Sequence, residues 1–171
     1  PNACNLRHLD RSLGWTAGHL KAWYGQEPPT DPRLAREESA AVIGLLSGDA
    51  GERILWAWHF GWEPARRVSG TDWMAPLLGR LWEDPYSAVR FVAHRSLRGD
   101  PAMRGVAYDF VGPEEARAAA AREVGARWEP VKGAEPARRR ALLLRDDGSL
   151  DAEATGRWQA QRNDRPLHLR E

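Results

Sequence analysis

The N-terminal segment carries the pair of side chains in this chain that is best suited to chemistry. It reads Cys4-Asn5-Leu6-Arg7-His8. Covalent haem attachment uses Cys-x-x-Cys-His, in which two thiols bond the porphyrin and the adjacent imidazole ligates the iron. Arg7 stands here at the position of the second cysteine. The segment therefore predicts either a haem held by one thioether at Cys4 with His8 as axial ligand, or a segment that has lost its haem.

A six-coordinate haem would need a second axial ligand besides His8. His59 is the first candidate, because it follows strongly aromatic residues on a predicted helix, and His19 is a weaker one. His94 occupies the same position as His59 in an internal repeat described below. The alternative for both is a structural histidine that bonds a backbone carbonyl between repeats. We interpret His168, in the C-terminal tail, as a surface residue.

Other signatures of chemistry are weak. The chain has no Gly-rich phosphate loop, no His-Glu-x-x-His pair and no Gly-x-Ser-x-Gly motif. The five histidines show no metal-ligand spacing. Glu114-Glu115 and Asp146-Asp147 are adjacent acidic pairs, and adjacent residues on a helix point apart. We therefore expect them to be solvated, and we expect an electron carrier or a scaffold rather than an enzyme.

Composition limits the class of protein. The chain has 171 residues, 42% hydrophobic and 29% charged, as in one globular domain. A formal net charge of +1 argues against a nucleic-acid partner, and the basic run Arg138 to Arg140 is expected to be a solvated face.

Cys4 is the single cysteine of the chain, so no intramolecular disulfide can form. No apolar run approaches the roughly 20 residues of a membrane span. Because the chain starts at Pro1, we expect a processed product or part of a longer protein.

Caps and apolar spacing predict a succession of helices. Asp31-Pro32 begins the first long one, which Gly48 ends, and Asp49 begins the next, with Ile54, Leu55, Trp58 and Trp62 on its apolar face. The predicted helices cover 31–48, 49–62, 72–81, 84–99, 113–127 and 151–162. The stretch 129–135 is predicted to be a loop, and Asp147-Gly148 a tight turn between short apolar runs.

An internal repeat links these helices. A shift of 35 residues (84 − 49) places Asp49 over Asp84, Ile54 over Val89 and His59 over His94. Helix pairs repeating at this interval are typical of HEAT-like α-solenoids. The predicted fold is therefore all-α, a HEAT-like solenoid of a few helix pairs with a short hairpin and a helix near the C-terminus. We divide it into 1–30, the haem-attachment segment and first helix, 31–128, the repeats, and 129–171, the C-terminal part, within one compact domain.

Several segments in the same order carry a resemblance to a known family. The chain resembles the last haem segment and the HEAT-like C-terminal region of bacterial multihaem c-type cytochromes. The residues that carry this resemblance are 2–10, Ser12, Trp15, His19-Leu20, 23–25, 58–62, 84–90, 95–98 and 164–166. The resemblance implies a periplasmic or extracellular electron-transport protein that binds iron in haem c. It also implies partners among upstream haem modules or other cytochrome subunits.

Three functions compete. In the first, the domain holds or covers one haem of an electron-transfer chain, through Cys4 and His8. In the second, it is a haem-free HEAT-like scaffold for protein–protein interaction within a cytochrome or respiratory complex, a use that repeat folds serve well. The departure at Arg7 favours this alternative. The third, an enzyme acting on nucleic acid, is disfavoured by the low net charge.

Overall fold

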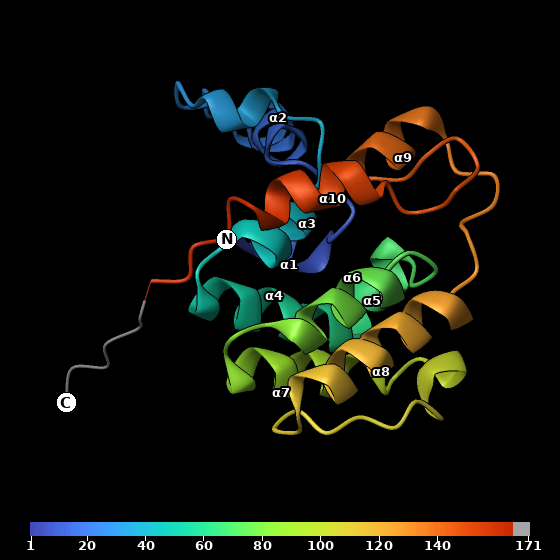
Figure 1. The fold of residues 1–171 in the computed structure, drawn as a ribbon. Helices are drawn as coiled ribbons and strands as arrows, with labels where there is room; N and C mark the ends of the chain where they lie inside the picture. The colour runs from blue at the N-terminus through green and yellow to red at the C-terminus, as the bar shows by residue number, and fades with distance from the viewer. Residues whose placement is uncertain (166–171) are drawn as a thin grey trace.

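The computed structural model describes residues 1–165, so His168 and most of the predicted tail lie outside the described part. The all-α class is confirmed: the chain up to residue 165 forms ten α-helices and three short 3₁₀-helices (Figure 1). The α-helices are α1 Ala3–Arg7, α2 Leu13–Tyr24, α3 Ala40–Ser47, α4 Ala50–Gly61, α5 Glu63–Ser69, α6 Ala75–Arg80, α7 Ser87–Leu97, α8 Glu114–Arg127, α9 Pro136–Ala141 and α10 Ala152–Gln159. The 3₁₀-helices are η1 Pro32–Ala35, η2 Leu81–Glu83 and η3 Pro101–Met103.

The helices pack as pairs, an arrangement compatible with an α-solenoid. α3 packs on α4, α6 packs on α7, and α4 lies against α7, so two helix pairs stack on each other. α8 then covers α6 and η2. The shift of 35 residues carries α3 onto α6 and η2, as the repeat predicted. The hairpin is present in its shortest form, as one antiparallel bridge between Leu144 and Leu150 around the turn at Gly148.

The predicted apolar face of α4 was wrong for three of its four residues, and only Ile54 packs, partly buried, against the core. Leu55, Trp58 and Trp62 are exposed, and the buried side chains are Arg53, Trp56, Ala57 and Phe60 together with Ala50. The prediction assumed that the large apolar residues lie inside, whereas Arg53 lies inside because an ion pair compensates its charge. At a shift of 36 (93 − 57), Arg53, Ala57 and Phe60 of α4 fall over the buried Val89, Ala93 and Ser96 of α7, whereas at a shift of 35 no buried residue of α4 falls over a buried residue of α7. His59 and His94 are therefore not equivalent.

Ser39, rather than Asp31, begins the first core helix. The hydroxyl of Ser39 accepts hydrogen bonds from the N–H groups of Ala41 and Val42 and donates to the carbonyl of Leu9. Because this buried side chain satisfies the first N–H groups of α3, the helix starts there. The helix predicted over 31–48 is thus divided into η1, capped by Asp31, and α3.

Three α-helices were not predicted, α1, α5 and α9. α9 contains the basic run, and each of its arginines pairs with a carboxylate: Arg138 with Asp72, Arg139 with Asp146 and Arg140 with Glu37. The interpretation of this run as a solvated face agrees with these exposed pairs. No helix within residues 1–165 is both long and apolar enough to cross a membrane.

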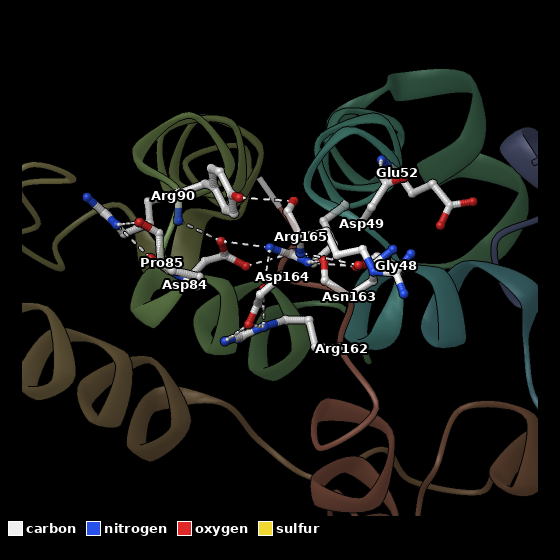
Figure 2. A network of polar contacts seen from close by, with 12 residues as sticks. Gly48, Asp49, Glu52, Asp84, Pro85, Arg90, Arg162, Asn163, Asp164 and Arg165 are labelled. Atoms are coloured by element: carbon white, nitrogen blue, oxygen red, sulfur yellow. Dashed lines mark hydrogen bonds and ion pairs between the residues drawn. The ribbon is translucent and has the colours of Figure 1, made fainter. Parts of the chain in front are cut away.

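A buried ion pair joins the two helix pairs. Arg53 of α4 lies 2.8 Å from Asp84, through its Nε, and both side chains are fully buried. The same guanidinium donates to the carbonyls of Gly48 and Asn163 and to Asp164. Figure 2 shows how these contacts connect the turn at Gly48, the turn at Asp84 and the C-terminal segment. One arginine therefore ties together three segments that lie far apart in the sequence.

Candidate haem-attachment site

Cys4 and His8 lie one helical turn apart on α1. The backbone N–H of His8 donates to the carbonyl of Cys4 over 2.8 Å, and the side chain of Asn2 caps the helix by accepting from the N–H of Asn5. Both Cys4 and His8 are partly buried, and Cys4 is a free thiol. Residues at this spacing are neighbours on a helix surface. The thiol and the imidazole are thus presented by one short, capped element.

Asn5 holds this segment in place. Its side chain is completely buried; the amide donates to the carbonyls of Arg11 and Ser12, and the amide oxygen accepts from the hydroxyl of Thr16. On the other side, the hydroxyl of Ser69 accepts from the N–H of Leu9. α1 is therefore fixed between α2 and α5. Sequence reasoning missed Asn5, because an asparagine at this position gives no signal of its long-range partners.

A row of rings continues from His8 along α2. Ring centroids are 4.9 Å apart between His8 and Trp15, 4.4 Å between Trp15 and His19, and 4.8 Å between His19 and Trp23. We call His8, Trp15, His19 and Trp23 the aromatic row. The α2 members recur every four residues, which places them on one face. Because Trp15 lies between the two imidazoles, the structure does not bring His19 directly against His8.

The surroundings of His8 lower the pKa of its imidazole. Burial lowers the pKa of His8, an effect that the charges of Arg7 and Arg11 reinforce and that Asp10 opposes. A pKa below the ordinary value of about 6.5 leaves the ring neutral at pH 7, with a lone pair on one nitrogen. Neutral imidazole is the form that binds metals. The side chain is therefore in the protonation state that an axial ligand requires.

His59 and His94 lie in different surroundings. His59 packs against Trp62 with 5.4 Å between ring centroids, and its Nδ1 is buried without a hydrogen-bond partner within residues 1–165. Burial lowers the pKa of His59, and the backbone of Leu6 in α1 opposes that shift. α4, which carries His59, packs on α1, and the role of His59 as a second ligand stays a prediction.

His94 belongs to an aromatic cluster on the other helix pair. Its ring centroid lies 5.4 Å from that of Trp82 and 5.1 Å from that of Tyr108, and these two rings stack 4.0 Å apart. The hydroxyl of Tyr108 donates to the carbonyl of Trp82, and burial raises the pKa of Tyr108 to about 12. Burial also lowers the pKa of His94, with a contribution from Arg98. These contacts favour a packing role for His94.

The described residues offer one free thiol at Cys4 and one partly buried imidazole at His8 as donors in this segment. In the described part of the chain, no three His, Cys, Asp or Glu side chains gather as metal ligands, so iron at His8 would take its equatorial ligands from a porphyrin. Arg7 is exposed, and no second thiol is available. Cys4 and His8 do not line the cavity of about 400 Å³ beside Leu13, Arg36 and Trp56. The prediction of a haem at this segment rests on the two donors and on the aromatic row.

The remaining acidic pairs take no part in this site. Glu114 and Glu115 lie in the first turn of α8, where negative charge is favoured by the helix dipole. Asp147 accepts from the hydroxyl and from the N–H of Ser149 in the hairpin turn, and these bonds lower the pKa of Asp147. Both pairs have structural explanations that need no catalysis.

The chain was compared with known proteins. No protein-family model matches it, and neither the curated proteins nor the solved structures contain a significant match. The likeness to multihaem cytochromes therefore rests on the ordered motifs of the sequence.

Proposed function

We propose that this domain holds or covers one haem c of a multihaem electron-transfer protein outside the cytoplasm. The observation that carries the proposal is the pairing of Cys4 with a neutral His8, one turn apart on an anchored helix beside the aromatic row. A haem bound there would supply reversible one-electron chemistry at iron. Upstream haem modules or other cytochrome subunits would be its electron partners.

The residues of the chain have separate tasks in this proposal. The thiol of Cys4 tethers the group, and the imidazole of His8 offers its lone pair. Trp15 packs against the ring of His8, and the guanidinium of Arg11 lies 5.7 Å from the indole of Trp15. The indole therefore holds the imidazole of His8 on one side. Asn5 fixes the backbone that carries both donors. His59 is proposed as the second ligand because α4, which carries it, packs on α1.

The test is a pyridine haemochrome spectrum of the protein produced with a c-type haem maturation system. A single thioether leaves one vinyl group, so the α-band is expected between those of haem b and haem c. Arg7→Cys restores the second thiol and is expected to move the band to the position of haem c. Cys4→Ala is expected to release the haem into acid–acetone, and His8→Ala to change the spin state of the iron.

Arg122→Glu, an exposed change on α8, serves as the control and is expected to leave the spectrum unaltered. If Cys4→Ala still carries covalent haem, or if Arg7→Cys gains none, the proposal is wrong. The variant Arg7→Cys distinguishes two cases. In one, the segment lacks only the second thiol of the haem motif; in the other, no maturation system recognises the segment.

A haem-free scaffold is the second candidate function. It is favoured by Arg7 at the position of the second cysteine and by the aromatic residues exposed on α4 and α7. A protein that contains no haem, in either the original form or Arg7→Cys, would support it.

A further inference from the structure

The outer sides of α4 and α7 expose large side chains that a monomer would normally bury. On α4, Leu55, Trp58 and Trp62 are 37%, 46% and 41% exposed, and on α7 Phe91 is 44% exposed. These positions follow each other at helical spacing of three or four residues. Monomeric soluble proteins rarely expose contiguous apolar patches of large size, and those that exist are often binding sites.

The two helices present these residues as one surface. α4 packs directly on α7, and the hydroxyl of Ser96 donates to the carbonyl of Ala57 over 2.7 Å. The guanidinium of Arg95 lies 4.7 Å over the ring of Trp58, which bridges the helices. A hollow of about 160 Å³ lies between them. It is lined by Trp58, Gly61, Trp62, Glu63, Arg95 and Ser96.

One arginine, Arg95, lines this hollow, and Arg98 follows it at the end of α7. Arg66, Arg95 and Arg98 form no ion pair with any carboxylate within residues 1–165, whereas the three arginines of α9 all do. Arg66 instead donates to the carbonyl of Phe60 and lies beside Gly99. The only carboxylate in the lining of the hollow belongs to Glu63, which already pairs with Arg67 over 3.5 Å. The arginines at this surface are therefore available to an external anion.

We propose that this aromatic–arginine face, made of Leu55, Trp58, Trp62, Phe91, Arg95 and Arg98 with Arg66 at its edge, docks an acidic segment of a partner protein. An apolar side chain of the partner would occupy the hollow beside Trp58, and its carboxylates would meet Arg95 and Arg98. Tryptophan and arginine are the residues most enriched at energetic centres of protein interfaces. Bidentate arginine–carboxylate contacts supply orientation as well as affinity.

A protein partner fits this face better than a nucleic acid does. Nucleic-acid affinity depends on neutralising many phosphates, whereas this face offers three guanidinium groups around an apolar centre, on a chain of net charge +1. The proposal does not depend on haem at Cys4, since α4 and α7 present the face whether or not α1 carries a cofactor.

The experiment uses a fluorescein-labelled peptide of eight residues in which glutamate alternates with phenylalanine, and the same peptide with glutamine in place of glutamate. Fluorescence anisotropy with the full chain is expected to show binding of the glutamate peptide, at least tenfold weaker binding of the glutamine peptide, and loss of affinity as salt rises. Trp58→Ala and Arg95→Glu are each expected to weaken binding at least tenfold. Arg122→Glu, the same charge change on α8, is the matched control and is expected to bind as the original chain does.

Three results would overturn the proposal. One is equal binding of the two peptides, or no binding of either peptide at protein concentrations up to the millimolar range. Another is tighter binding of a single-stranded oligothymidylate than of the glutamate peptide, with the same dependence on Arg95. The third is a concentration-dependent dimer in sedimentation that Trp58→Ala dissolves, which would assign the face to a second copy of this chain. Circular dichroism verifies that each variant is folded, and the haem content of Trp58→Ala is expected to equal that of the original chain, so failure here is distinct from failure at Cys4.

Discussion

At the scale of single residues, Arg53 and Asp84 illustrate how a charged pair can replace apolar packing in a core. The guanidinium contacts both carboxylate oxygens, at 2.8 Å and 3.2 Å, and both side chains are fully buried. Arg53 also donates to the carbonyls of Gly48 and Asn163 and to the carboxylate of Asp164. Asp84 also accepts from the N–H of Tyr86. The attraction within such a buried pair is largely offset by the cost of removing both charges from water, so the pair stabilises the fold little compared with apolar residues. Removing one partner is nevertheless costly, because the other charge is then left buried and unpaired.

We predict that Arg53→Met destabilises the protein by about 3–5 kcal/mol, because it leaves the carboxylate of Asp84 buried and uncompensated. The double variant Arg53→Met/Asp84→Leu is expected to lose less than the sum of the two single changes. Urea unfolding followed by circular dichroism measures all four proteins. Additive losses would show that the two charges are not coupled.

At the scale of elements, the contact between α3 and α4 requires a glycine, Gly44, on α3. The indole of Trp56 lies over Gly44, where an added Cβ would be only 2.0 Å from Nε1. Trp56 is buried, so it has little room to retreat. A close helix–helix approach of this kind requires glycine even though glycine lowers helix propensity.

Gly44→Ala is therefore predicted to destabilise the protein by about 1–2 kcal/mol, because overpacking outweighs the gain in helix propensity. Gly18→Ala on α2 is the matched control, since nothing lies within 4 Å of its added Cβ. That change is expected to raise stability by up to about 1 kcal/mol. Thermal unfolding of both variants gives the comparison, and a loss at Gly18 equal to that at Gly44 would refute the packing argument.

At the scale of the whole molecule, three partly buried histidines make stability depend on pH. Burial lowers the pKa values of His8, His59 and His94 in the folded protein below the unfolded value of about 6.5. The unfolded chain then binds more protons than the folded chain in this range. Stability contributed by the neutral rings is present above pH 6.5 and is lost as the pH falls through the folded pKa values.

We predict that the free energy of unfolding is lower at pH 5 than at pH 7.5, and that His94→Gln reduces this difference. Glutamine carries no titrating group, so the variant removes one of the three contributions while keeping a polar side chain of related size. Urea titrations of both proteins at the two pH values measure the effect. An unchanged pH dependence in the variant would exclude His94 as a contributor.

The sequence by itself determined the helical class, the caps at Asp31, Asp49 and Asp151, the hairpin turn at Gly148 and the pairing of helices at an interval near 35 residues. These features depend on local chemistry: a side chain that accepts from N–H groups two or three residues ahead, or a glycine that adopts a positive φ angle.

Only the tertiary structure decided which face of α4 lies inside. Arg53 is buried because Asp84, 31 positions along the chain, meets its charge, and Trp58 and Trp62 are exposed as a consequence. It also separated His59 from His94 and placed Asn5 as the anchor of α1. In each case the deciding partner is distant in sequence. The free-energy cost of burying a polar group depends on whether such a partner pairs with it in the folded protein. The spacing of residues along the chain does not indicate which distant residues pair in the folded protein.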